Sequence, residues 1–191
     1  MRLYSMPSSG NSYKVRLLLA LLGRTAEVVD CEYGSAELAQ ARAVLPFGKV
    51  PALLLDDGQV LAESDAILWF LGEGTGFVPA DPVARAQMLA WMFWEQYSHE
   101  PYVAVARFQV RYAGKPVSEL EPRLVERGKG ALQRLEDGLA LSPFLVGEAV
   151  SLADVALVAY TRVAHEGGFD LGDYPAVAAW VKRVEAALKI T

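Results

Sequence analysis

The sequence predicts two domains, a small α/β domain with a mixed four-stranded sheet followed by an all-α domain. Strand and helix signals alternate in the order β-α-β-α-β-β-α over residues 2–72. A stretch rich in glycine and proline follows over residues 72–82, and every periodic segment beyond it is helical. A β-α-β crossover makes the first strands parallel, whereas a hairpin is antiparallel, so we expect a sheet of mixed direction.

The elements of the first domain follow from apolar spacing and turn residues. Apolar residues from Val15 to Leu22 recur at helical spacing, and Gly23 is placed to end that helix. Two apolar runs around Asp57-Gly58 are typical of a hairpin. In chain order we expect a strand at residues 2–5, a helix at 15–22, a strand at 26–31, a helix at 35–43, the hairpin, and a helix at 64–71.

The second domain is read as four helices. We expect them at residues 83–112, 117–139, 151–166 and 175–188. The third has the best-marked start, because Ser151 and Asp154 have the spacing of a capping box. Val150 and Val155 are placed as its hydrophobic staple, and we interpret this motif as structural. The predicted domains therefore span residues 1–75 and 83–191.

Composition excludes several classes of function. The chain has 191 residues and a net charge of -5, which argues against a surface that follows nucleic-acid phosphates. Its apolar runs are too short to cross a membrane, and no signal-peptide pattern is seen, so a cytoplasmic protein is expected. Cys31 is the single cysteine, which excludes a CxxC pair, and we expect it to be inert packing. His99 and His165 lack metal-ligand spacing, so no metal is expected.

Four segments together carry a resemblance to a known family. "GKVPALLLDDG" and "AESDAILWFL" resemble the thioredoxin-like N-terminal domain of the cytosolic glutathione transferases, and Val50-Pro51 is placed for a cis peptide bond. "GEAVSLADVAL" and "YPAVAAWVKRV" are similar to the helical C-terminal domain of that family. The resemblance covers essentially the whole chain. It implies a bacterial-type glutathione transferase with a serine-type active site.

The resemblance implies a glutathione site at Lys49, Val50, Glu63 and Ser64. Glutathione carries two carboxylates and an ammonium group. A helix N-terminus at Ser64 suits a carboxylate, because backbone N–H groups and the helix dipole favour negative charge there. Glu63 suits the ammonium group, and the backbone before Pro51 is placed to pair with the cysteinyl part as an added strand would.

The stretch "PSSGNSYKVRLLLALLG" places many hydroxyl and amide groups at the entrance of the first helix. Hydrogen-bond donors and a helix N-terminus both favour the thiolate of glutathione over its thiol. The resemblance aligns Ser9 with the catalytic hydroxyl of serine-type classes and Asn11 with the cysteine of bacterial cysteine-type classes. Ser9 is our first candidate for the catalytic residue and Asn11 the second, with Ser8 or Ser12 as helix caps.

The aromatic-rich segment "WMFWEQYSHEPYVAVARFQVRY", near the start of the second domain, suggests a partner and a second substrate. In the family the matching helix lines the dimer interface and the cleft for the electrophile. The resemblance therefore implies a homodimer, with a small electrophilic substrate near Tyr97, Tyr102, Arg107 and Arg111.

The leading interpretation is a glutathione transferase that uses glutathione as a co-substrate and needs no cofactor. Two alternatives remain open: a glutathione-dependent disulfide or peroxide reductase, and a non-catalytic interaction module with the same fold.

Overall fold

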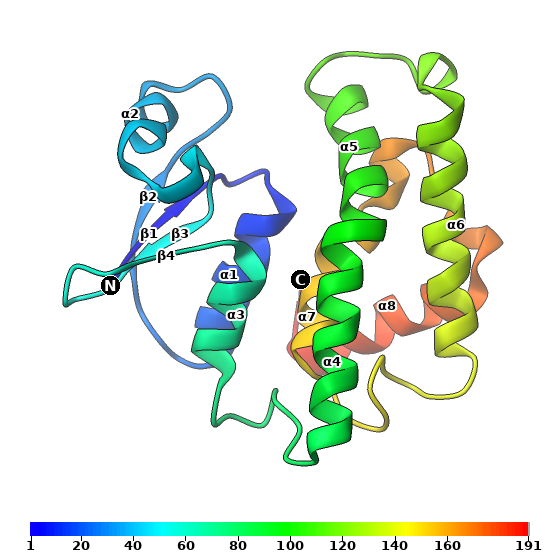
Figure 1. Ribbon diagram of the computed structural model, residues 1–191. Helices are drawn as coiled ribbons and strands as arrows, with labels where there is room; N and C mark the ends of the chain where they lie inside the picture. The colour runs from blue at the N-terminus through cyan, green and yellow to red at the C-terminus, as the bar shows by residue number, and fades with distance from the viewer. Residues whose placement is uncertain (191) are drawn as a thin grey trace. The chain divides into compact units, whose positions relative to one another are not determined.

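The computed structural model describes residues 1–190, apart from the side chain of Val44. The chain divides into two compact units, Met1–Thr75 and Gly76–Thr191, drawn in Figure 1. The first is built around a sheet and the second is built from helices, so the expected fold class is confirmed.

Four strands form the sheet of the first unit, in the spatial order β2-β1-β3-β4. They are β1 (Arg2–Ser5), β2 (Glu27–Asp30), β3 (Ala52–Leu54) and β4 (Val60–Ala62). β1 pairs with β2 in parallel, and the other two pairs are antiparallel, so the sheet is mixed as predicted.

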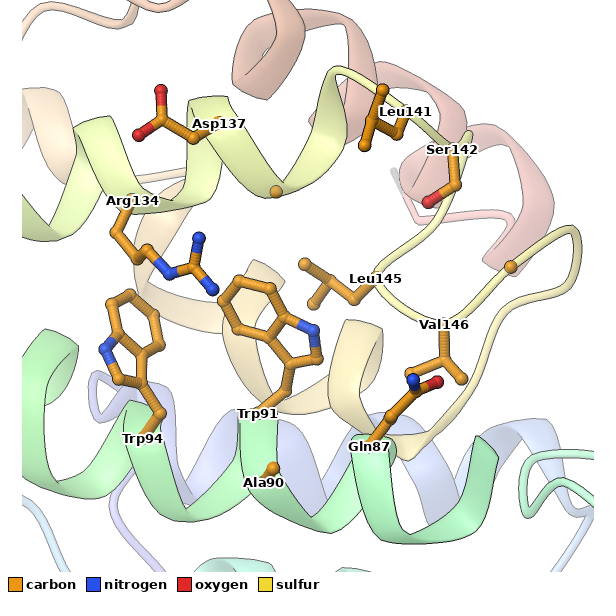
Figure 2. A pocket seen from close by; sticks show the side chains of 12 residues that line it. Gln87, Ala90, Trp91, Trp94, Arg134, Asp137, Leu141, Ser142, Leu145 and Val146 are labelled. Carbon is orange, nitrogen blue, oxygen red and sulfur yellow. The ribbon is translucent and has the colours of Figure 1, made fainter. Parts of the chain in front are cut away.

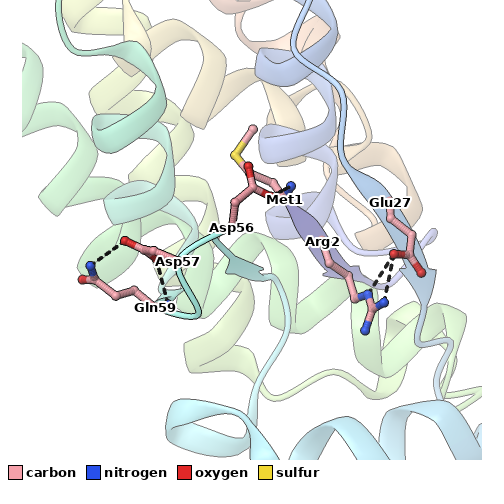
Figure 3. Close-up of polar contacts among 6 residues, drawn as sticks. All are labelled: Met1, Arg2, Glu27, Asp56, Asp57 and Gln59. Carbon is pink, nitrogen blue, oxygen red and sulfur yellow. Dashed lines mark hydrogen bonds and ion pairs between the residues drawn. The ribbon is translucent and has the colours of Figure 1, made fainter.

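Polar side chains stabilise the outer parts of the sheet (Figure 3). The Arg2 guanidinium donates to a Glu27 carboxylate oxygen at 3.0 Å and links β1 to β2. In the hairpin, the backbone N–H of Gln59 donates to Asp57 Oδ1 at 3.0 Å. Gly58 adopts a left-handed φ of 89°, which glycine tolerates without a steric penalty and which explains the Asp-Gly signal.

The sheet lies between two helical layers of the first unit. Its helices are α1 (Gly10–Leu21), α2 (Ala36–Val44) and α3 (Ser64–Gly72), and a 3-10 turn spans Pro46–Gly48. α1 and α3 pack against each other on one face, and α2 covers the other (Figure 1). Side chains alternate across β1, because Leu3 is buried beneath one layer while Tyr4 packs on the α2 side.

The second unit is a helical bundle around one fully buried helix. Its helices are α4 (Pro82–Trp94), a π-helix (Glu95–His99), α5 (Glu100–Arg111), α6 (Pro122–Leu139), α7 (Leu152–Thr161) and α8 (Pro175–Leu188), with short 3-10 turns at residues 117–119, 164–167 and 171–173. Every residue of α7 is buried, so this helix forms the centre of the core.

A buried carboxylate holds the start of α7. Asp154 Oδ2 accepts from the backbone N–H of Ser151 at 2.9 Å and from its hydroxyl at 3.0 Å, so the predicted capping box is present. Asp154 Oδ1 accepts from the backbone N–H of Leu145 at 3.0 Å and from the indole N–H of Trp180 at 2.9 Å. This one side chain therefore joins α7 to the preceding loop and to α8.

The helix predicted at residues 83–112 is divided by the π-helix in the structure. Pro101 lies just beyond it and has no N–H to donate to the carbonyl four residues earlier, so a regular α-helix cannot continue through this point. The helix predicted to run to residue 166 ends at Thr161 and is followed by a 3-10 turn. Of the helices described in residues 1–190, none has both the length and the apolar character needed to cross a membrane.

Candidate active site

The sheet register brings three segments of the first unit to one end of the sheet. Tyr4 lies opposite Ala52 on β3, and Ala52 lies opposite Ala62 on β4. β1 leads from this row into the entrance of α1, and β4 leads into Glu63 and Ser64. β3 begins from Lys49 and Val50 at the same end. All candidate glutathione residues and both catalytic candidates therefore lie at this one end of the sheet.

Ser9 is the N-cap of α1. Its hydroxyl oxygen accepts from the backbone N–H of Ser12 at 3.4 Å, and its backbone has the extended conformation usual at this position. The Ser9 hydroxyl donates to no residue in the described part of the chain, 1–190, and the side chain is only half-buried. A hydroxyl that accepts from the helix end keeps its own proton for a ligand.

The neighbouring serines have structural contacts instead. The Ser8 hydroxyl donates to Glu32 Oε1 at 2.7 Å, and Ser12 Oγ accepts from the backbone N–H of Met6 at 3.0 Å. The expectation that Ser8 or Ser12 caps the helix was therefore wrong. Sequence spacing alone did not distinguish the cap, because all of these residues have a hydroxyl within one turn of the helix start.

Arg16 fixes the loop that leads into α1. Its guanidinium donates to Ser5 Oγ at 3.1 Å and to the carbonyl of Pro7 at 2.7 Å. Burial lowers the pKa of Arg16, and the nearby carboxylates of Asp30 and Glu32 oppose that shift. The loop is thus held by a cation on the helix that it enters, which gives Ser9 a defined position.

Asn11 and Ser64 connect the two helix N-termini of the candidate site. The Ser64 hydroxyl donates to Asn11 Oδ1 at 3.4 Å, although 53 residues separate the two in the sequence. Ser64 is the first residue of α3 and is 3% exposed. The predicted catalytic region and the predicted glutathione region are therefore in direct contact.

Glu63 adopts a strained backbone at the start of α3. Its φ is 68° and its ψ is 122°, a conformation that non-glycine residues rarely occupy. The side chain is exposed and makes no capping hydrogen bond to the helix. Glu63 is therefore held in an unfavourable backbone conformation, and its exposed carboxylate does not cap the helix.

Lys49 and Val50 precede the first residue of β3. Lys49 is exposed, whereas Val50 is half-buried and packs against the apolar cluster beneath α2. The Val50-Pro51 peptide bond is cis, as predicted. Phe47, just before them, is exposed and has a φ of 62°. No sequence signal pointed to this exposed aromatic residue.

Cys31 lies in the core on the α2 side of the sheet. It is fully buried, and burial raises the pKa of its thiol, so the thiolate is disfavoured. The expectation of inert packing agrees with this environment.

The four electrophile-site candidates occupy two places in the helical unit. Arg107 Nε lies 2.7 Å and Arg111 Nε 3.6 Å from Glu166 Oε2, so both arginines surround one carboxylate. Tyr97 and Tyr102 line a pocket of about 540 Å³ between the π-helix, α5 and α6, and Tyr97 is 84% exposed.

A second pocket of the helical unit, of about 640 Å³, is lined by α4, α6 and the loop before α7 (Figure 2). Trp91 and Trp94 pack edge to face, with their ring centroids 5.3 Å apart. The Arg134 guanidinium lies 5.6 Å from the centre of the Trp91 ring, a cation–π distance. Trp94 and Arg134 also line the Tyr97 pocket, so the two hollows are neighbours.

Sequence reasoning missed two charged residues behind the site, Lys14 and Asp65. Lys14 lies on α1 with its side chain completely buried, and its Nζ is 3.5 Å from Asp65 Oδ1. A signal was available, because Lys14 lies four residues before Leu18 and so falls on the apolar face of the helix.

The fold and the site define a thioredoxin-like α/β unit joined to a helical unit, with the candidate residues at one end of the sheet. Residues 3–75 match the glutathione S-transferase N-terminal domain, and residues 91–187 match the glutathione S-transferase C-terminal domain. The chain belongs to the glutathione S-transferase family, which confirms the expected family and its fold.

Three relatives show the range of the family. The crystal structure of a glutathione S-transferase from Pseudomonas fluorescens matches this chain with a TM-score of 0.91 and 47% sequence identity. The match covers 97% of this chain and 94% of that one. Glutathione S-transferase 3 of Zea mays is 30% identical, over 97% of this chain and 89% of its own length. A disulfide-bond oxidoreductase of Escherichia coli is 31% identical, over 96% and 89% respectively.

Proposed function

We propose that this protein is a glutathione transferase in which the hydroxyl of Ser9 stabilises the thiolate of bound glutathione. The thiolate attacks an electrophilic carbon of a small hydrophobic substrate, which becomes bonded to sulfur as its leaving group departs. The observation that supports this most strongly is the contact between Asn11 and Ser64 at 3.4 Å. It joins a site for the γ-glutamyl end of glutathione to a site for its sulfur.

The sulfur end is supported by the entrance of α1. An unperturbed thiol has a pKa of about 8.5 and is mostly protonated at neutral pH. The Ser9 hydroxyl and the first N–H groups of α1 are donors that favour the thiolate. Asn11 remains the second candidate for this contact, because its side chain lies on the first turn of the same helix.

The γ-glutamyl end is supported by the start of α3. The first N–H groups of this helix provide donors for a carboxylate. The Ser64 hydroxyl donates to Asn11 Oδ1 in this structure, and its O–H can rotate to donate to a bound carboxylate instead. Glu63 is exposed beside them and is suited to the ammonium group. Lys49 and the backbone of Val50 lie at the same end of the sheet and complete the proposed glutathione site in residues 1–75.

Two assays test the proposed function. We expect the protein to be retained on immobilised glutathione and to conjugate glutathione to chlorodinitrobenzene. Failure of retention would favour the non-catalytic module. Retention without conjugation, together with reduction of a model disulfide, would favour the reductase.

A glutathione-dependent disulfide reductase is the second candidate function. The similarity to the disulfide-bond oxidoreductase of Escherichia coli favours it. Asn11 favours it too, because the resemblance aligns this residue with the cysteine of bacterial cysteine-type classes. Cys31 is buried, so such a reaction would use the glutathione thiols rather than a protein thiol. The two reactions share the thiolate and differ in its target, a carbon or a sulfur atom.

Replacement of Ser64 with alanine should weaken glutathione binding by about 1–3 kcal/mol, the range for a hydrogen bond to a charged group. Isothermal titration calorimetry measures this directly. Ser35→Ala is the matched control, because Ser35 is the N-cap of α2 and accepts from the Leu38 N–H at 3.1 Å. The control should lose stability and keep its affinity. Unchanged affinity in Ser64→Ala would leave Ser64 as a structural residue.

We also propose that the protein is a homodimer. Several apolar side chains on and beside α4 are exposed, including Phe93 at 69% and Val83 at 63%. Exposed apolar surface of this kind marks an interaction site. Light scattering at micromolar concentration should give about twice the chain mass of 20.8 kDa. A monomer mass across that range would contradict the proposal.

The second substrate is proposed to contact the helical unit. Tyr97, Tyr102, Arg107 and Arg111 stay predictions for this role. Tyr97 and Tyr102 have the support of a shared pocket, whereas Arg107 and Arg111 are engaged by Glu166.

A further inference from the structure

A buried ion pair lies directly behind the proposed glutathione site. Lys14 Nζ on α1 is 3.5 Å from Asp65 Oδ1 on α3. The Lys14 side chain is fully buried, and the Asp65 side chain is 12% exposed. Burial raises the pKa of Asp65, the charge of Lys14 opposes this shift, and the charge of Glu63 adds to it.

The geometry of this ion pair is not the geometry expected of a pair that only stabilises the fold. Taking two charges out of water is costly, and only good geometry with further hydrogen bonds offsets the cost. The separation is long for a charge-assisted hydrogen bond, and Asp65 Oδ2 is buried with no hydrogen-bond partner among the described residues. Apolar residues of similar volume often stabilise such a position as well or better. The pair therefore calls for another explanation.

The position of the pair relative to the site supplies that explanation. Lys14 lies one helical turn after Asn11 on α1, and Asp65 follows Ser64 on α3. The contacts Asn11–Ser64 and Lys14–Asp65 are thus successive polar links between the same two helices, at 3.4 and 3.5 Å. The first link lies at the helix ends, and the second lies behind it in the interior.

The charges of the pair also suit an anionic ligand. Asp65 is in the first turn of α3, where an isolated carboxylate would repel a ligand carboxylate bound at the same helix end. Lys14 compensates that charge from behind. The helix N-terminus is thereby left free to attract the ligand.

We propose that Lys14 and Asp65 are positioning residues that fix the N-terminus of α3 against that of α1. This inference rests on the proposed function, because those two helix ends are the proposed sites of the γ-glutamyl group and of the sulfur. The pair touches neither end of the ligand. It sets the separation between them through Asn11 and Ser64.

The test separates positioning from stability with an apolar double variant. Lys14→Met leaves the Asp65 carboxylate without this cation, and Asp65→Asn removes one carboxylate from beside Lys14, so each variant should lower the urea midpoint. Lys14→Met/Asp65→Leu should recover most of that loss. Its dissociation constant for glutathione should nevertheless stay about tenfold or more above wild type, because a shift of about 1 Å in a site has large effects. The pKa of the bound thiol should rise in the same variant.

The outcomes are distinguishable from failure of the proposed function itself. A wild-type protein that does not bind glutathione overturns both proposals. A double variant with recovered stability and wild-type affinity overturns the positioning role alone. If the double variant does not fold, Asp65→Asn keeps the side-chain shape, and affinity within about twofold of wild type would overturn the role.

The control uses an ion pair in the helical unit. Arg162 Nε donates to Glu185 Oε1 at 2.9 Å, and both residues lie outside the proposed glutathione site. Arg162→Met/Glu185→Leu should leave the glutathione dissociation constant unchanged. A change of the same size as in the Lys14/Asp65 variant would contradict a role specific to that pair.

Discussion

Replacement of Asp154 with alanine is expected to lower the free energy of unfolding by about 3–5 kcal/mol, since each buried donor left unpaired costs about 1–3 kcal/mol. The carboxylate accepts from the backbone N–H groups of Leu145 and Ser151 and from the indole of Trp180. Alanine would leave these three donors without an acceptor inside the bundle. It would also remove the cap of α7, whose residues form the centre of the core.

Urea denaturation followed by circular dichroism measures the effect. Asp137→Ala is the matched control, because Asp137 is an exposed carboxylate on α6 that accepts from the side chain of Gln133 at 2.9 Å. The control should change stability by less than about 0.5 kcal/mol, as is usual for surface positions. Equal effects in the two variants would contradict the buried role of Asp154.

Replacement of Ser9 with alanine is expected to raise the pKa of bound glutathione by about one unit, which corresponds to about 1.4 kcal/mol. A thiolate gains more from a hydroxyl donor than a neutral thiol does, so the affinity should change little. Conjugation of chlorodinitrobenzene should fall by about tenfold at neutral pH and recover in part as the pH is raised. The pH dependence of the conjugation rate is the measurement.

Two control variants interpret the Ser9 result. Ser9 is also a helix cap, so Ser9→Ala should lose about 1 kcal/mol of stability, as Ser35→Ala should at the N-cap of α2. Asn11→Ala tests the second candidate. A pH profile that shifts in Asn11→Ala and stays wild-type in Ser9→Ala would assign the sulfur contact to Asn11.

Most of the fold was predictable from the sequence because its signals are local. The helical spacing from Val15 to Leu22, the Asp57-Gly58 turn and the capping box at Ser151 each depend on neighbouring residues. The π-helix before Pro101 was not predicted, because proline indicates where a helix is disturbed and not how the chain accommodates it.

The candidate site was predictable only in part, because its decisive contacts join distant segments. The sequence pointed to Ser9, Asn11, Glu63 and Ser64, yet the contact between Asn11 and Ser64 depends on the packing of α1 against α3. The choice of Ser9 over Ser8 and Ser12 as the cap depends on which hydroxyls find partners elsewhere, such as Glu32. The strained φ of Glu63 is likewise imposed by the tertiary structure.

The central claim is that the site binds glutathione and stabilises its thiolate. Titration of the ultraviolet absorbance of the thiolate, with glutathione bound to the wild-type protein, tests this most directly. We expect the bound thiol to titrate at least about one unit below the unperturbed value near 8.5, with part of that shift lost in Ser9→Ala. A bound thiol that titrates at the pKa of free glutathione would contradict the account.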